Sequence, residues 1–216
     1  MVKRIGLIVI AVSLWSFSHV LGNNYVLGKC ILPETLQIQN DSLTVDDLFE
    51  VDYLPLFNTV FLKLEDLHSC NIEIRDKNIE TTMAARPKFF SLFRVRSKRK
   101  YVIVYNSNSD FDGVLLKDVP EGALSGLYAH ELMHIRDYQS KRFFGVLKRG
   151  WQYLSKRGKK KLEYHIDIMT IEAGFGKSLY EWTFYVLNDS SASEEYKAFK
   201  REIYMSPEDI LNRLKE

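Results

Sequence analysis

Apolar and polar residues follow two different periods along this chain, and the change of period divides it into a strand-rich and a helix-rich part. Residues 71–75 (NIEIR) alternate as in a half-buried strand, while 88–96 (KFFSLFRVR) and 101–106 (YVIVYN) are rich in β-branched and aromatic residues. A short basic turn separates the last two runs, so they predict a β-hairpin. Upstream, 43–68 carries apolar residues at helical spacing and predicts one or two short helices, with a break at Pro55.

Helical spacing dominates after Pro120. Apolar residues recur at three- and four-residue steps in 122–139, which predicts a helix there. The segment 141–160 is irregular and basic, and its glycines argue against a long helix. Further helices are predicted at 162–173 with Gly174 as C-cap, at 177–188, at 192–204 after a capping box of Ser191 and Glu194, and at 207–215 with Ser206 as N-cap. The order predicts an α+β fold, with a small sheet or hairpin followed by a mainly helical C-terminal half.

The N-terminal residues have the pattern of a secretory signal peptide. Two basic residues precede an apolar run, and small residues stand at the positions that a signal peptidase reads. We therefore expect 1–22 to be removed on export to the periplasm or the medium, which leaves 23–216 as a single domain. The alternative is an uncleaved membrane anchor, because the run 5–21 is just at the lower length limit of a membrane span.

Export also changes what the two cysteines predict. Cys30 and Cys70 both lie in the mature part of the chain. In an oxidising compartment an even pair of cysteines favours a disulfide over two thiols. We therefore expect a bond between Cys30 and Cys70.

The composition is that of an ordinary globular domain, but its charge is unevenly distributed. Of 216 residues, 46% are hydrophobic and 27% charged, with a formal net charge of +2, which excludes disordered, collagen-like and disulfide-dense classes. Seven basic residues and no acid occur in 86–100, and nine basic residues and no acid occur in 141–161. The second stretch also carries aromatic residues, and with export this favours an anionic membrane surface over nucleic acid as a partner. The alternative is a solvated rim paired with the acidic remainder of the fold.

The most informative motif is His130-Glu131-Leu132-Met133-His134, inside the helix predicted at 122–139. Two histidines four residues apart project from one helix face, so both ring nitrogens can reach a single Zn²⁺. Glu131 lies about 100° round the helix from His130, where it can reach a zinc-bound water rather than the ion. The spacing is the HExxH geometry of zinc peptidases.

A catalytic zinc takes three protein ligands and leaves a fourth position for water. The extended HExxHxxGxxH pattern is excluded, because Asp137 and Ser140 replace its Gly and its third His. The next predicted helix supplies three candidates, Glu163, His165 and Glu172. Glu163 shares a helix face with Asp167, whereas His165 lies about 200° away on the same wheel. Helix phase therefore favours Glu163, and His165 is the alternative ligand.

This pattern resembles the gluzincins, the thermolysin-like zinc metallopeptidases, in which HExxH is followed downstream by ExxxD. Glu163 to Asp167 (EYHID) matches ExxxD, so the resemblance implies Glu163 as third ligand and Asp167 as the group that holds a ligand histidine in its tautomer. The run 126–182, with HELMH, LEYHID and IEAGFG, covers about a quarter of the chain and is similar to a group of small secreted bacterial HExxH metallopeptidases. The resemblance implies a zincin-like fold.

The resemblance also implies a mechanism. One Zn²⁺ would acidify its bound water and polarise the scissile carbonyl, while Glu131 takes the proton and delivers it to the leaving amine. Extended substrate would pair with a strand edge beside the zinc helix, expected in the hairpin 88–106 and there above all at 101–106. Thermolysin-like enzymes place a transition-state-stabilising His after the third ligand, but this chain has no histidine after His165. The donor would then be His165 itself, a tyrosine such as Tyr164 or Tyr180, or a basic residue.

The sequence thus predicts an exported zinc-dependent metallopeptidase that acts on a peptide or protein substrate. A reading from a different class is a non-hydrolytic envelope protein that uses a zincin fold to bind or scaffold a partner. An altered motif residue would favour that reading, and HELMH is intact.

Overall fold

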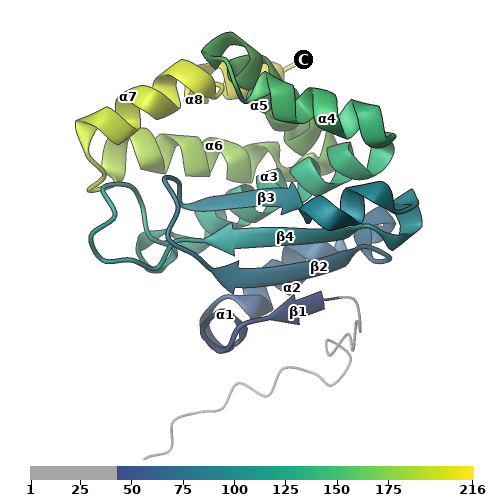
Figure 1. Ribbon diagram of the computed structural model, residues 1–216. Helices are drawn as coiled ribbons and strands as arrows, with labels where there is room; N and C mark the ends of the chain where they lie inside the picture. Colours follow the sequence, from purple (N-terminus) through teal and green to yellow (C-terminus); the bar gives the residue numbers. More distant parts are fainter. Residues whose placement is uncertain (1–42) are drawn as a thin grey trace, which may run out of the picture. The chain divides into compact units, whose positions relative to one another are not determined.

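The computed structural model describes residues 43–216, an α+β arrangement in which short strands come before a run of helices (Figure 1). The strands are β1 (Leu43–Val45), β2 (Asn71–Asp76), β3 (Met83–Pro87) and β4 (Lys100–Tyr105). The helices are α1 (Asp47–Asp52), α2 (Leu54–Leu62), α3 (Glu121–Ser140), α4 (Phe143–Gln152), α5 (Lys156–Thr170), α6 (Gly176–Phe184), α7 (Glu194–Ile203) and α8 (Pro207–Arg213). The coarse prediction of a small sheet followed by helices is confirmed. The predicted signal peptide, 1–22, lies outside the described residues.

The four strands form one mixed sheet in the order β1-β2-β4-β3. β1 pairs parallel with β2, and β2 pairs parallel with β4, with Ile74 opposite Ile103. β3 runs antiparallel to β4 and places Ala85 opposite the same Ile103. β4 is therefore an inner strand, so the expectation that 101–106 offers the free edge is wrong. The edge beside the helices is β3.

The predicted hairpin has the correct second strand and the wrong first strand. Residues 88–96 are not a strand, because Phe89–Phe93 and Arg96–Lys98 form short 3₁₀ turns. The Ser91 hydroxyl donates to the backbone carbonyls of Lys88 and Lys100, which ties this turn to the start of β4. The aromatic residues that suggested a strand are largely exposed, and strand preference depends on a surface to pack against.

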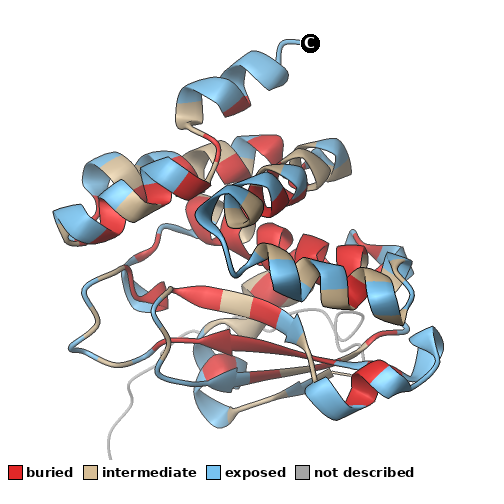
Figure 2. Cartoon of the chain, turned by 45° about the horizontal axis from the view of Figure 1, so that its top comes forward, coloured by how far each residue is buried: buried red, intermediate tan, exposed pale blue. Residues whose placement is uncertain are grey.

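One face of the sheet forms the core together with the long central helix α3, which packs against β3, α2, α5 and α6. An aromatic cluster joins four elements: Phe49 of α1 contacts Tyr105 of β4, and Phe57 of α2 contacts Tyr128 of α3 with ring centroids 5.3 Å apart. Figure 2 shows the buried residues concentrated where sheet and helices face one another. In Figure 1, α4, α5, α7 and α8 lie beyond the β3 edge.

The helix predictions succeed where apolar spacing is regular. α3 matches 122–139, and α1 and α2 match the two short helices, with Pro55 in the first turn of α2. α8 has the predicted Ser206 cap, in a capping box with Asp209. α5 ends four residues before the bend at Gly174, whose φ of 88° lies in the left-handed region that glycine tolerates.

Two helix predictions are wrong in detail. The segment after Lys141 is not irregular, because α4 forms there and is held by buried Val146, while a side chain added at Gly150, one turn later, would meet no other atom within 4 Å. α7 is capped by Ser193, whose side chain accepts from the Tyr196 N–H, and not by Ser191. The Ser193 N–H donates to the Asp112 carbonyl, and this contact from a distant loop fixes where the helix begins.

Candidate metal centre

The middle of α3 presents two buried histidines one turn apart. His130 and His134 are each 4% exposed, and their ring centroids lie 4.9 Å apart. The other residues of this stretch of α3, including Leu132 and Ile135, are buried in the core around the helix. The core thus fixes the rotation of α3, and with it the face from which both imidazoles project.

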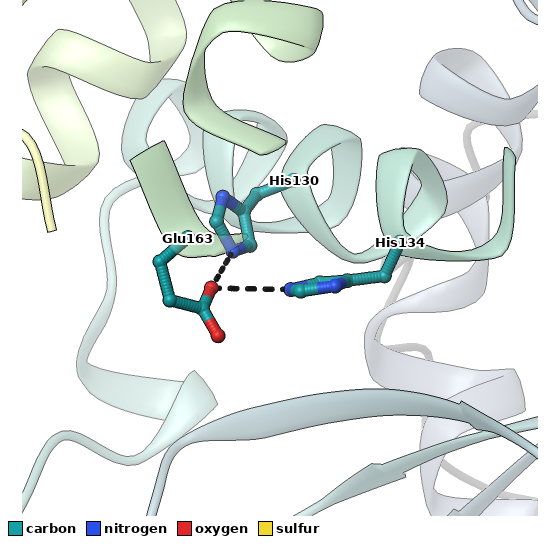
Figure 3. A group of neighbouring side chains, drawn as sticks. All are labelled: His130, His134 and Glu163. Atoms are coloured by element: carbon teal, nitrogen blue, oxygen red, sulfur yellow. Dashed lines mark hydrogen bonds and ion pairs between the residues drawn. The ribbon is translucent and has the colours of Figure 1, made fainter. Parts of the chain in front are cut away.

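Glu163 of α5 reaches the same point from the opposite side. Its Oε2 lies 3.3 Å from His130 Nε2 and 3.2 Å from His134 Nε2. Figure 3 marks these two contacts with dashed lines. The donor atoms of these three residues all lie within 4.8 Å of one another. Two imidazoles and a carboxylate that converge in this way can hold a metal ion.

Asp167, one turn after Glu163, orients His130. His130 Nδ1 donates to Asp167 Oδ1 at 2.9 Å, and the other carboxylate oxygen accepts from the Met205 N–H at 3.0 Å. With Nδ1 committed to Asp167, His130 Nε2 faces Glu163 and the ion position. The contact expected of Asp167 is present.

The charged forms of His130 and Glu163 stabilise each other. Burial opposes a charge on His130, but hydrogen bonds to Asp167 and Glu163 outweigh it and raise the pKa of His130 to about 10. Burial likewise opposes the Glu163 carboxylate, yet the charge of His134 and hydrogen bonds from both histidines hold the pKa of Glu163 well below its usual range. A metal ion binding here therefore displaces a proton.

Glu131 lies next to the cluster and contacts the sheet edge. Its Oε2 accepts from the Ala85 N–H of β3 at 2.6 Å. Strand β3 bonds to β4 at the flanking Thr82 and Lys88, so the two-residue period of the strand turns the backbone groups of Ala85 outward. Glu131 is thus held by the strand edge and is absent from the three-residue cluster, as the HExxH phase predicts.

A cleft of about 1070 Å³ opens over the cluster. Its wall includes Glu131, His134 and Glu163, together with edge-strand residues Met83 to Ala85. A ligand in this cleft meets His134, Glu163, Glu131 and the outward edge of β3 at once.

Two tyrosines of the cleft were not predicted. The Tyr153 hydroxyl donates to Glu163 Oε1 at 3.0 Å, and the Tyr204 ring lies 5.7 Å from that of His130. Burial, then the charges of Glu163 and Glu131, raise the pKa of Tyr204 well above its ordinary value, so its hydroxyl stays a donor. Tyr153 belongs to the segment predicted to be irregular, and Tyr204 follows α7; no local pattern connects either with HExxH.

The alternative site residues lie elsewhere. His165 is not part of the cluster: its side chain is 45% exposed, and its Nε2 lies 3.2 Å from Asp137 Oδ1. His165, Tyr164 and Tyr180 are absent from the lining of the cleft. The expectation that His165 serves as an alternative ligand is therefore wrong, and none of the three is placed to act as a donor.

Asp137, three residues after His134, connects α3 to α4 through an ion pair. It is 2% exposed and accepts from Arg149 of α4 and from Lys141, at 2.7 to 2.8 Å. Burial opposes its charge, but these two cations outweigh that effect and lower the pKa of Asp137. The end of α3 that follows the motif is thereby fixed to α4.

The predicted disulfide remains a prediction. Cys30 lies outside the described residues, and Cys70 is buried, which raises the pKa of its thiol to about 11.

Comparison with known proteins identified no relative of this chain. No protein-family model, curated protein or solved structure matches this chain. Within 43–216, none of the helices combines the length and the apolar character needed to cross a bilayer. The geometry of the centre therefore carries the functional argument.

Proposed function

We propose that this protein is an exported, zinc-dependent metallopeptidase with a zincin-like active site of the gluzincin type. One observation carries the proposal. The intact HExxH helix and the downstream Glu163 bring three ligand atoms together beside a cleft that His134, Glu163, Glu131 and the edge strand β3 line. Export is proposed from the signal-like pattern of 1–22.

Zinc fits the spacing of the donor atoms. Four ligands placed tetrahedrally at 2.0–2.1 Å from an ion are roughly 3.3–3.4 Å from one another. The distances from Glu163 Oε2 to the two histidine Nε2 atoms are 3.3 and 3.2 Å. Calcium takes six to eight oxygen ligands at longer distances, so a donor set with two nitrogens does not suit it.

Glu131 and the tyrosines supply the remaining chemistry. When bound, the ion would act as a Lewis acid toward a carbonyl and would lower the pKa of a water molecule. The Glu131 carboxylate would accept the proton of an attacking water molecule and would deliver it to the leaving nitrogen. Tyr204, whose hydroxyl stays protonated, replaces the absent downstream histidine as donor to the developing oxyanion, while Tyr153 donates to Glu163 Oε1 and holds this ligand in place.

The edge strand β3 supplies substrate binding. An extended peptide can add to the outward groups of Met83 and Ala85 as a further strand, and this orients its backbone along the cleft. Pro87 has no N–H to donate at the far end of the strand. Because the bonds are made by backbone atoms, this mode accepts peptides and proteins of varied sequence.

The experiment measures zinc content and peptide hydrolysis in parallel. We expect about one zinc per chain in the parent and in Glu131→Gln, and none in His130→Ala, because a zinc site needs its three protein ligands. Hydrolysis of a mixed peptide library, followed by mass spectrometry, should fall about 10²- to 10⁴-fold in Glu131→Gln, as for loss of a general base. His165→Ala is the matched control, since this histidine lies on α5 outside the cluster, and it should keep both zinc and activity.

Two outcomes contradict the proposal in different ways. Absence of zinc from the purified parent would remove the metal centre itself. If the parent and Glu131→Gln both contain zinc and neither hydrolyses peptides, the protein is a non-hydrolytic binding protein and not a peptidase.

A further inference from the structure

A group of large apolar side chains is exposed on one surface, formed by the turn after β3 and by α4 with the residues that follow it. We call this surface the aromatic face; it consists of Phe89, Phe90, Phe93, Phe144, Trp151 and Leu154, each 65–84% exposed. Within 43–216, comparable exposure of a large apolar residue occurs at Val95, which adjoins the face, and at Val51. Single exposed apolar residues are ordinary, but a contiguous group marks an interaction surface.

The two segments form one continuous surface. Phe93 contacts Phe143 with ring centroids 5.3 Å apart, which joins the 3₁₀ turn to the start of α4. Phe89, Trp151 and Leu154 line the same apolar groove, of about 540 Å³. The aromatic face therefore presents side chains from both segments around one groove.

Basic residues border this surface. Arg94, Arg96 and Arg142 line a second pocket, of about 500 Å³, together with Phe93. These three arginines are exposed and make no ion pair with any residue of 43–216. The paired basic residues are different ones, such as Lys141 and Arg149, which contact Asp137. The alternative in which the basic residues pair with acidic ones therefore holds for only part of the two basic stretches.

We infer that the aromatic face and its arginine pocket dock on an anionic lipid membrane. Exposed Phe and Trp side chains enter the interfacial region of a bilayer, where apolar burial is favourable. Arginines at the border bind lipid phosphates and are attracted by a negative surface potential. We therefore place the membrane contact at 89–96 and 142–154, and not along the whole of 141–161 as expected from the sequence. Lys159 and Lys160 lie over aromatic rings of the helical half instead.

The docked surface adjoins the metal cleft. The apolar groove and the cleft share Ala84 and Ala85 of β3 and Tyr153. A bilayer at the aromatic face therefore lies next to the edge strand, and a polypeptide that leaves the bilayer reaches this edge first. This substrate class, a membrane-associated polypeptide, rests on the proposed function; the docking itself does not.

The test is co-sedimentation of the purified full chain with two kinds of vesicle. One contains equal parts of phosphatidylglycerol and phosphatidylcholine, and the other contains phosphatidylcholine alone. We expect retention on the first and little on the second. Arg94→Gln/Arg96→Gln/Arg142→Gln should weaken binding about a hundred-fold, at the usual contribution of each basic residue near an anionic surface.

Matched variants distinguish the contribution of the aromatic face and its arginines from the effect of removing any exposed apolar or basic side chain. Phe90→Ser/Phe144→Ser/Trp151→Ser removes three exposed rings and should lose retention, whereas Val51→Ser, an equally exposed apolar residue of α1, should keep it. Lys117→Gln/Lys177→Gln/Lys215→Gln removes the same charge from other elements and should bind almost as the parent does. Circular dichroism and zinc content verify that each variant is folded.

Equal retention of the parent and the two face variants on anionic vesicles would overturn the inference. It would also be overturned if no vesicle retained the parent while the parent formed an oligomer that the aromatic variant lost, since the face would then bind a second copy. His130→Ala should be retained like the parent, so failure of the metal centre and failure of docking are distinguishable.

Discussion

At the residue scale, the centre depends on a carboxylate that does not touch the ion position. Asp167 bonds to His130 Nδ1 and to the Met205 N–H, so it fixes both the tautomer and the direction of the imidazole. Asp167→Asn can present its amide N–H to the same nitrogen and would then favour the wrong tautomer.

We therefore expect Asp167→Asn to bind zinc about 10- to 100-fold more weakly than the parent, the usual cost of losing such a partner. Competition with a chromophoric chelator measures the affinity. Glu172→Gln, an exposed carboxylate just after α5, is the control and should bind as the parent does. Equal affinity of Asp167→Asn and parent would show that Asp167 does not support the ligand.

Local spacing was sufficient to predict the metal-ligand candidates, because HExxH and the Glu163–Asp167 pair each lie within a single helix. The phase of α5 correctly separated Glu163 from His165, which points to Asp137. Tyr153 and Tyr204 could not be predicted, because their approach to the cluster depends on how distant helices pack, and a tyrosine has no spacing rule of its own.

At the scale of elements, the position of α3 depends on its close approach to α6. A Cβ added at Gly126 would lie 2.1 Å from the Ser178 backbone carbonyl oxygen, a distance that no side-chain movement can relieve. Gly126 lies four residues before His130, so the closest point of this contact is one turn from the metal ligands.

Gly126→Ala should lower the free energy of unfolding by about 1–3 kcal/mol, as is typical of overpacking in a dense interior. Urea denaturation measures the difference. In α4, where a Cβ at Gly150 meets nothing within 4 Å, Gly150→Ala should leave stability unchanged or raise it by up to about 1 kcal/mol. A Gly126→Ala protein as stable as the parent would mean that α3 and α6 can separate without cost.

The wrong element predictions share one physical cause. Strand preference was inferred from the aromatic residues of 88–96, although these side chains have no sheet face to cover and remain exposed. The true strand, β3, is short and contains two alanines, so its sequence carries little signal and its place depends on β4 and α3. α4 was missed because two glycines lower helix preference, while the contact of Arg149 with Asp137 is not local.

At the scale of the whole molecule, the proposed metal binding would be coupled to folding. His130 and His134 come from α3 and Glu163 comes from α5, so the three ligands converge only when these helices are packed. The strand order could not be predicted from the sequence, because it also depends on contacts between distant segments. β2 pairs parallel with β4 although β3 lies between them in the chain.

Zinc should therefore stabilise the folded protein, by about 2.7 kcal/mol when free zinc is 100 times its dissociation constant. Metal-stripped parent should unfold at a lower temperature than the zinc-loaded protein, and added zinc should restore the difference. His130→Ala should not respond in the same differential scanning fluorimetry assay. A melting temperature independent of zinc in the parent would indicate that the ligands do not bind the ion in the folded state.

The contact between Glu131 and Ala85 has a consequence for how a peptide would enter. The Glu131 carboxylate accepts the Ala85 N–H that a paired strand would need, so Glu131 competes with a peptide for this donor. A peptide that takes the Ala85 N–H must release Glu131 in the same exchange. Binding of the peptide and release of the Glu131 carboxylate are then one event. While no peptide is bound, Glu131 stays hydrogen-bonded to Ala85.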